Sequence, residues 1–218
     1  NQDPEQLGLD AILDNRLVRE GLTWRGLNWA FSSAWQENLF FYPLSLVSHM
    51  LDCQVYGLNP AGHHFSSLLL HAIAVVFFFL FLERLTGAFW RSALAAGLYA
   101  IHPLGAESAA WVAERSNVIC AALMALSLYA YSGYAQNRRK KWYGISLAAF
   151  VLALLAKPTA VMMPVILILL DWLVLSGPVS QTGKRFLPFV IVDKIPFILF
   201  SGLRFWAVLL AGRGTSPV

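Results

Sequence analysis

The sequence predicts an all-α protein, a polytopic transmembrane helical bundle with about six hydrophobic segments of the kind that bilayers accommodate. Two observations support this fold class. Hydrophobic residues make up 58% of the 218 residues, and only 13% are charged, whereas soluble domains have about 25% charged residues. The basic residues also lie in short clusters between apolar runs, where they determine topology. The net charge of +4 therefore does not indicate a nucleic-acid partner, and membrane lipid is the expected surrounding.

Residues 1–62 are predicted to form an extracytoplasmic loop, and residues 63–218 a transmembrane helical domain. The first part is charged and then aromatic, which favours one or two helices lying at the membrane interface. Its aromatic residues are expected to face the lipid headgroups; they are Trp24, Trp29, Phe31 and Trp35. Residues 45–52 are expected to be helical, and residues 57–60 to form a turn.

The apolar runs then follow in order. Residues 64–85 form the clearest span, and residues 92–101 begin a second one that ends at His102-Pro103. That second span is expected to continue as a helix over residues 107–115. The remaining runs are expected at 118–135, 143–156, 160–175 and 186–210.

The dense basic run at residues 138–141 predicts the orientation, because such runs stay on the cytoplasmic side. Alternation then places the loops 83–91, 136–142 and 176–185 inside. Residues 1–62, residues 102–117 and Lys157 fall outside. Asp171 and Trp172 lie near the inner face and are expected to act as an interfacial anchor. Three separated polar features would therefore share the outer face.

The segment from His102 to Arg115 is the strongest candidate for a site, because charges at membrane depth usually have a function or a partner. If residues 107–115 are helical, Glu107, Trp111 and Arg115 share one face and suit an anionic ligand. The alternative is a loop held by an interfacial Trp and a local Glu–Arg pair. For Lys157 the alternative is a lysine whose side chain extends to the interface from a helix end.

The histidines do not have the spacing of a metal site. His64 and His71 stand seven residues apart, without the i, i+4 spacing or third ligand that zinc sites use. They are expected to cap or line the outer end of the first span. His49 and Asp52 are expected to form a structural pair. No metal site and no firm cofactor are predicted.

A series of short motifs carries a family resemblance. In chain order they are Pro43-Leu44-Ser45, Ser48-His49-Met50-Leu51-Asp52, Gly57-Leu58-Asn59-Pro60, Gly62-His63-His64, Leu69-Leu70-His71, His102-Pro103, Glu107-Ser108, Trp111-Val112-Ala113-Glu114-Arg115, Lys157-Pro158 and Leu170-Asp171-Trp172. This series resembles the membrane domain of the bacterial-type, TPR-bearing O-mannosyltransferase-like proteins of the GT-C glycosyltransferase superfamily. The resemblance implies a GT-C-like fold, further helices outside this sequence, a C-terminal tetratricopeptide array and a bacterial plasma (inner) membrane.

The resemblance also implies a reaction. A sugar, mannose in this family, moves from a polyprenyl-phosphate carrier to a hydroxyl of a protein or glycan on the non-cytoplasmic face, with inversion at the anomeric carbon. Such chemistry requires a base for the hydroxyl proton and cationic or hydrogen-bonding groups for the departing phosphate. This fragment by itself is expected to be inactive.

Residue roles follow from matching motifs. Asn1-Gln2-Asp3 matches the start of the family's acidic motif, so Asp3 is the expected base, but Pro4 replaces the second acid and Glu5 follows it. Arg115 and Lys157 are assigned to the phosphate. His102 would contact phosphate or sugar, and Glu107 would orient the acceptor or help to hold a divalent cation. The supporting candidates are Glu5, Glu114 and His64.

Two other classes of function remain open. One is a non-catalytic membrane scaffold or assembly protein that kept the fold, which the replacement by Pro4 favours. Gly105 and Ser116-Asn117 also replace a histidine and a Lys-Asp pair that the family often has. The other is a lipid or solute transporter, which would predict inverted repeats with broken helices. The sequence shows no such repeat.

Overall fold

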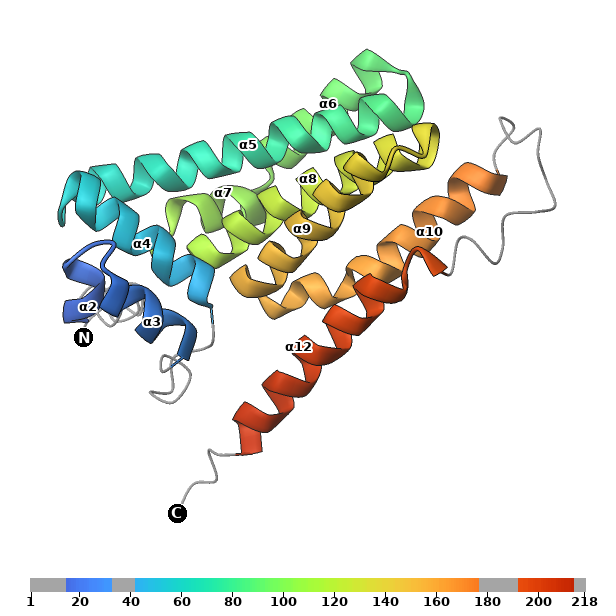
Figure 1. Ribbon diagram of the computed structural model, residues 1–218. Helices are drawn as coiled ribbons and strands as arrows, with labels where there is room; N and C mark the ends of the chain where they lie inside the picture. The colour runs from blue at the N-terminus through green and yellow to red at the C-terminus, as the bar shows by residue number, and fades with distance from the viewer. Residues whose placement is uncertain (1–14, 33–41, 177–191, 214–218) are drawn as a thin grey trace.

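The computed structural model describes residues 15–32, 42–176 and 192–213. Within these ranges every regular element is a helix, which confirms the all-α prediction for the described part of the chain. Figure 1 shows a set of long helices stacked side by side, with the small N-terminal helices at one end and α12 crossing the opposite side of the stack.

The N-terminal helices α2 (Arg16–Arg19), α3 (Trp24–Ser32) and α4 (Pro43–Tyr56) form a small core of their own. Val18, Trp29 and Met50 are buried in it, so the prediction that Trp29 faces lipid is wrong. Trp24 and Phe31 are exposed, as an interfacial orientation requires, whereas Trp35 lies outside the described residues. The N-terminal segment is thus helical where it is described, and one of its tryptophans belongs to its small core.

The first long helix, α5 (Pro60–Thr86), contains the whole of the first predicted span. Asn59 caps its N-terminus by accepting a hydrogen bond from the backbone N–H of Ala61, and Pro60 occupies the first turn, where no N–H partner is needed. Gly87 ends the helix in the left-handed conformation that glycine adopts without steric strain. At 27 residues, α5 is long enough to cross a bilayer.

The second long helix, α8 (Arg115–Asn137), packs along α5 and forms the centre of the bundle. Length and composition identify two candidate membrane spans within the described ranges, Pro60–Thr86 and Val112–Asn137. The apolar helical stretches Pro158–Trp172 and Ile195–Leu209 are shorter. The predicted number of about six spans therefore stays a prediction, because several of the apolar helices are too short to count on length alone.

The chain turns sharply between α5 and α8. Helix α6 (Phe89–Ile101) stops at His102, as predicted, and α7 (Pro103–Ala110) starts directly after it. The predicted helix over residues 107–115 is wrong, because Trp111 takes up an extended conformation and the 3₁₀ turn η1 (Val112–Glu114) follows. Glu107 and Arg115 consequently belong to different helices and do not form the expected shared face.

Helix α9 (Lys140–Ala156) packs antiparallel to α8 and ends at Lys157. Pro158 then opens a 3₁₀ turn, η2 (Pro158–Met162), which leads into α10 (Met163–Ser176). Helix α12 (Ile195–Arg213) crosses α9 and η2. The main core lies between these helices, with Phe150, Leu167 and Phe197 fully buried.

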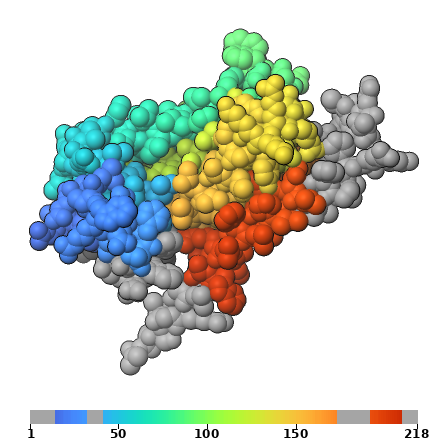
Figure 2. Space-filling model, in the orientation of Figure 1, coloured from blue at the N-terminus to red at the C-terminus, as the bar shows by residue number. Residues whose placement is uncertain are grey.

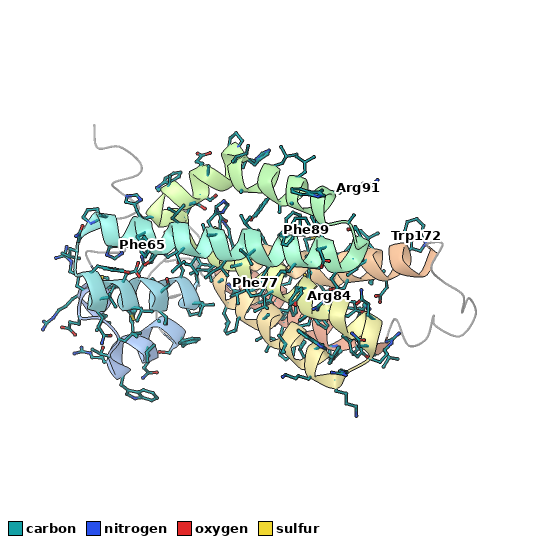
Figure 3. All side chains as sticks on the ribbon, turned by 90° about the horizontal axis from the view of Figure 1, so that it is seen from above. Phe65, Phe77, Arg84, Phe89, Arg91 and Trp172 are labelled. Atoms are coloured by element: carbon teal, nitrogen blue, oxygen red, sulfur yellow. The ribbon has the colours of Figure 1, made fainter. Side chains whose placement is uncertain are left out.

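A group of basic and aromatic residues lies at the end of the bundle away from the N-terminal helices. Figure 3 shows Arg84, Arg91 and Trp172 at this end and Phe65 at the other. Arg84 donates to the Tyr129 hydroxyl at 2.6 Å and stacks over the rings of Tyr129 and Trp142. We call this the basic end, and the end that carries Arg115 and Lys157 the polar end.

The prediction that Asp171 is an interfacial anchor is wrong. Asp171 is buried, accepts a 2.8 Å hydrogen bond from the Tyr131 hydroxyl and forms an ion pair with the buried Lys194. The pair joins α10 to the residue directly before α12. Trp172, by contrast, is 63% exposed, as an anchor would be.

Candidate functional site

Arg115 is completely buried at the start of α8, and the protein itself satisfies its guanidinium group. Its Nη1 forms an ion pair with Asp52 of α4. Its Nη2 donates to the backbone carbonyl of His63 at 2.5 Å, and its Nε donates to the hydroxyl of Ser67 at 3.2 Å. Every guanidinium nitrogen therefore has a partner in α4 or α5, and Arg115 joins these two helices to α8.

Asp52 is the centre of this buried network. Its second carboxylate oxygen accepts a 2.8 Å hydrogen bond from Ser66, and the Nδ1 of His63 lies 3.3 Å from the oxygen that Arg115 binds. The predicted pair of His49 and Asp52 is wrong, because neither ring nitrogen of His49 has a hydrogen-bond partner in the described ranges. The sequence did carry a signal for the observed pair, since a buried arginine in an apolar helix requires a carboxylate nearby.

A second polar network lies beside the first, at the junction of η1, α8 and the end of α9. Lys157 donates to the side-chain oxygen of Asn117, and its ammonium lies 3.5 Å from the Glu114 carboxylate. Asn117 in turn donates to Glu114 and, at 3.4 Å, to the hydroxyl of Ser108 on α7. The Lys157 and Glu114 side chains are 22% and 38% exposed, so this network is open to a ligand, unlike that of Arg115.

The two networks confirm that the segment from His102 to Arg115 and the distant Lys157 meet at one end of the bundle. Adjacent residues of this segment serve different networks, since Glu114 points to Lys157 and Arg115 points to Asp52. The antiparallel packing of α8 and α9 explains the meeting, because the beginning of one helix lies next to the end of the other.

The other predicted site residues lie further out. His102 is exposed and caps α7, with its Nδ1 accepting a 3.3 Å hydrogen bond from the backbone N–H of Leu104. Glu107 is exposed on α7, and no polar contact of its carboxylate is found in the part of the chain that the structure describes. Asp3 and Glu5 lie outside the described residues.

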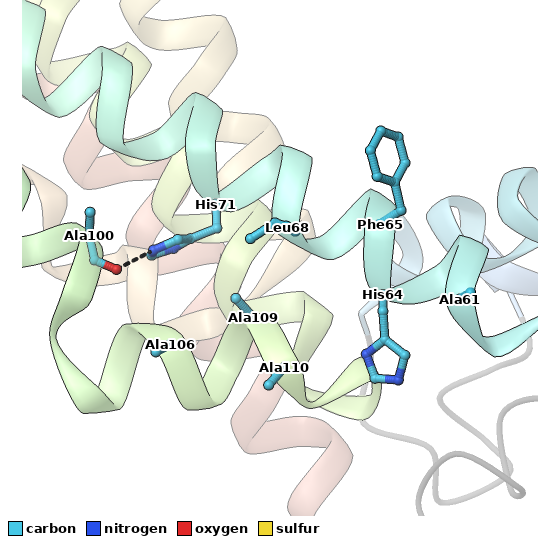
Figure 4. Close-up of a pocket in the computed structure, with 9 residues that line it drawn as sticks. All are labelled: Ala61, His64, Phe65, Leu68, His71, Ala100, Ala106, Ala109 and Ala110. Carbon is cyan, nitrogen blue, oxygen red and sulfur yellow. Dashed lines mark hydrogen bonds between the residues drawn. The ribbon is translucent and has the colours of Figure 1, made fainter.

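His64 and His71 line a pocket of about 480 Å³ between α5, α6 and α7. That they line the outer end of the first span stays a prediction, since His71 lies well inside α5. Figure 4 shows the imidazole of His71 bonded to the carbonyl of Ala100, at a distance of 3.1 Å. Alanine side chains form much of the remaining lining, from Ala61, Ala100, Ala106, Ala109 and Ala110. Among the described residues, no group of three or more His, Cys, Asp or Glu side chains is arranged to hold a metal ion.

Tyr42 directly precedes α4 and is partly buried. Burial raises the pKa of the Tyr42 hydroxyl, the charge of Arg204 opposes that rise, and the charge of Glu114 adds to it. Arg204 is 8% exposed and belongs to the last apolar run of the chain. The sequence analysis overlooked it, although an arginine within an apolar run is a signal for a functional or paired charge.

Comparisons with known proteins match most of the chain to one family. The family model described as dolichyl-phosphate-mannose-protein mannosyltransferase matches residues 51–206, which include Asp52, Arg115, Lys157 and Arg204. Protein O-mannosyl-transferase TMTC2 of mouse is 31% identical over 98 residues, covering 45% of this chain and 12% of the mouse protein. The Drosophila melanogaster protein O-mannosyl-transferases Tmtc1 and Tmtc2 are each 27% identical, over 55% and 80% of this chain.

The chain spans between 12% and 20% of the length of these relatives. No solved structure matches it. The family model covers well over half of the chain, from the C-terminal half of α4 through most of α12, and includes both polar networks. The chain therefore belongs to the dolichyl-phosphate-mannose-protein mannosyltransferase family of membrane proteins.

Proposed function

We propose that the full protein transfers mannose from a polyprenyl-phosphate carrier to a hydroxyl of a protein or glycan on the non-cytoplasmic side of its membrane. The family match supports a membrane mannosyltransferase in general. The observation that carries the proposal is the contact of Lys157 with Glu114 and Asn117, which brings a partly exposed cation to the polar end. A bacterial plasma membrane and a tetratricopeptide array stay predictions of the resemblance.

The proposed reaction is a single displacement. The acceptor oxygen attacks the anomeric carbon, the bond from that carbon to the phosphate oxygen breaks, and the lipid phosphate leaves with the bonding electrons. Asp3 is the proposed base for the hydroxyl proton, and Glu5 is its nearest substitute. Lys157 is the proposed phosphate ligand, because an ammonium is a compact charge that stabilises the negative charge building on the leaving group.

The remaining candidates receive supporting roles. Glu114 lies beside the Lys157 ammonium and would hold it in position. His102 and Glu107 are exposed on or next to α7, where they would reach sugar, acceptor or a divalent cation. His64 lines the neighbouring pocket. The phosphate contact that the sequence predicts for Arg115 is not tested by the structure. Because the guanidinium is enclosed and fully bonded, we propose that it positions α8 instead.

A second function has one observation in its favour. Pro4 stands where the resembling enzymes have a second acidic residue, and a chain without an effective base would be a non-catalytic scaffold with the same fold. Both functions accommodate the buried Arg115–Asp52 pair, since that pair holds helices together. The two functions differ in the roles of Lys157 and Asp3, which act on the sugar donor and the acceptor hydroxyl in the transferase and have no catalytic role in the scaffold.

Transfer of labelled mannose from a polyprenyl-phosphate donor by the full-length protein separates the two functions. Wild type is expected to transfer mannose, and Asp3→Asn to lower the rate by about 100-fold or more. Lys157→Gln is expected to lower it by about 100-fold, the effect of removing one charge-stabilising donor. Lys141→Gln, an exposed lysine in the first turn of α9, is the matched control and should retain the wild-type rate. Absence of transfer by wild type to a validated acceptor would support the scaffold.

A further inference from the structure

Asn117 lies in the first turn of α8, and its side chain bonds to three other elements. Its amide oxygen accepts a hydrogen bond from the Lys157 ammonium at the end of α9. Its amide nitrogen donates to the Glu114 carboxylate in η1 and, at 3.4 Å, to the hydroxyl of Ser108 on α7. These contacts use both amide hydrogens and the oxygen of the side chain. Asn117 is therefore the residue that holds the second network together.

The backbone fixes the other end of the Lys157 side chain. Lys157 ends α9 in an extended conformation, with φ −156° and ψ 139°, and proline favours this conformation in the residue before it. Helix α9 is itself held between α4, α8 and α12, and Figure 2 shows it packed directly against α12. The stem of a lysine is flexible, so an ammonium normally samples many positions. Here the backbone is fixed at one end of the stem and Asn117 binds the ammonium at the other.

The Lys157 ammonium keeps donors for a ligand. An ammonium has three N–H groups, and Asn117 accepts a hydrogen bond from it. The Glu114 carboxylate is 3.5 Å away, which is longer than the roughly 2.7–3.2 Å of a direct N–H···O bond. No further hydrogen-bond partner of the ammonium is found within residues 15–32, 42–176 and 192–213, and the side chain is 22% exposed. Asn117 thus orients the ammonium without consuming all of its donors.

The position of Glu114 makes the neutrality of Asn117 important. In a displacement with inversion, the acceptor oxygen and the leaving phosphate lie on opposite faces of the anomeric carbon. A phosphate bound by Lys157 would therefore have Glu114 on its own side, where a carboxylate repels it. An aspartate at position 117 would add a second carboxylate to this side. The amide of Asn117 fixes the ammonium, adds no negative charge and donates to the carboxylate that is already there.

We propose that Asn117 is a positioning residue, which holds the Lys157 ammonium in the orientation that meets the phosphate of the lipid-linked donor. This inference rests on the proposed function, which gives Lys157 its phosphate role. It adds a residue that acts through Lys157 and does not itself touch the donor. A charge that is oriented before the reaction stabilises the developing negative charge without further ordering, so Asn117 contributes to the rate and to phosphate binding.

The first test is a double-mutant cycle on the full-length protein in nanodiscs. It has two readouts, transfer of labelled mannose and binding of radiolabelled, unglycosylated polyprenyl phosphate. Asn117→Ala is expected to lower kcat/KM by about tenfold, the loss of one hydrogen bond to a charged group. Lys157→Met should lower it by about 100-fold. In the Lys157→Met background, Asn117→Ala should change either readout by less than about twofold, because no ammonium is left to position.

The second test concerns the charge at position 117. Asn117→Asp keeps the shape and the acceptor oxygen, and it is expected to raise the Kd of polyprenyl phosphate by about tenfold through repulsion. A merely structural role of Asn117 predicts a Kd close to that of wild type, because the aspartate still accepts a hydrogen bond from the ammonium. Asn137→Ala is the matched control, since Asn137 is an exposed asparagine at the opposite end of α8. It should match wild type in both readouts.

Equal fold-losses from Asn117→Ala in the two backgrounds would overturn the proposal, because the residue would then support the fold alone. Binding of polyprenyl phosphate by Asn117→Asp with the wild-type Kd would also overturn it. If Asn117→Ala does not fold, the Kd of the nearly isosteric Asn117→Asp decides. If wild type binds polyprenyl phosphate but transfers no mannose, the proposed function fails, and the cycle measured by binding decides the role of Asn117.

Discussion

The buried pair of Arg115 and Asp52 gives the most quantitative prediction. Arg115 is 0% exposed and Asp52 is 5% exposed, so Asp52→Asn leaves an uncompensated charge in the interior. Breaking such a pair from one side destabilises a protein by about 3–5 kcal/mol. Arg115 keeps its bonds to the His63 carbonyl and Ser67, which places the expected loss near the lower end of that range. Even about 3 kcal/mol raises the unfolding equilibrium constant more than 100-fold.

A double-mutant cycle measures the coupling directly. The free energy of unfolding of Asp52→Asn, Arg115→Met and the double variant is obtained from titration of the protein in mild detergent with SDS, followed by circular dichroism. Because the double variant has no unpaired charge, it is expected to be more stable than the sum of the single effects by about 2–3 kcal/mol. Arg16→Gln, which breaks the exposed ion pair of Arg16 with Glu20, is the control and should change stability by less than about 1 kcal/mol. Additive effects in the cycle would refute the central role of the pair.

Two further predictions concern packing and pH. Gly133→Ala is expected to destabilise the protein by about 1–3 kcal/mol, because its Cβ would lie 2.6 Å from the Arg84 guanidinium, which Tyr129 holds in place. Gly144→Ala on α9, with open space around the added carbon, should be neutral or stabilising in the same SDS titration. Burial, helped by the charge of Arg115, lowers the pKa of His49 to about 3, so the unfolded chain binds the proton that the folded chain excludes. Stability should therefore fall as the pH decreases from about 6.5 towards 3, by up to about 1.4 kcal/mol per pH unit, and His49→Phe should flatten this dependence. An unchanged slope in that variant, or equal effects at the two glycines, would contradict these assignments.

The features that could be predicted from the sequence are local or compositional. Long apolar runs gave the helices, and proline and glycine gave their ends at His102, Gly87 and Lys157, because these residues restrict the backbone regardless of the surroundings. The convergence of Lys157 with the segment before α8 followed from the alternation of helix directions. The prediction failed at Trp111, whose extended conformation ends α7 although the local sequence allows a helix to continue.

The pairing of the charges could not be predicted, because it depends on how helices rotate against one another. Arg115 and Glu114 are neighbours in sequence, and only the change from η1 to α8 turns one inward and the other towards Lys157. The ion pair of Asp171 with Lys194 likewise could not be predicted, because the two residues are far apart in sequence and meet only through the packing of the helices. The burial of Arg204 could not be predicted either, because its sequence neighbours are apolar and its burial depends on how α12 packs against η2 and α9.

The most direct test of the central claim is the side of the membrane on which the polar end opens, because the proposed function requires a lipid-linked mannose to reach Lys157 from the non-cytoplasmic side. In a cysteine-free background of the full-length protein, Leu104→Cys reports on this end and Lys141→Cys on the basic end; both positions are exposed. In intact cells or sealed, cytoplasm-inside vesicles, a membrane-impermeant maleimide is predicted to label position 104 and to reach position 141 only after permeabilisation. Labelling of position 141 without permeabilisation, with position 104 protected, would contradict the account.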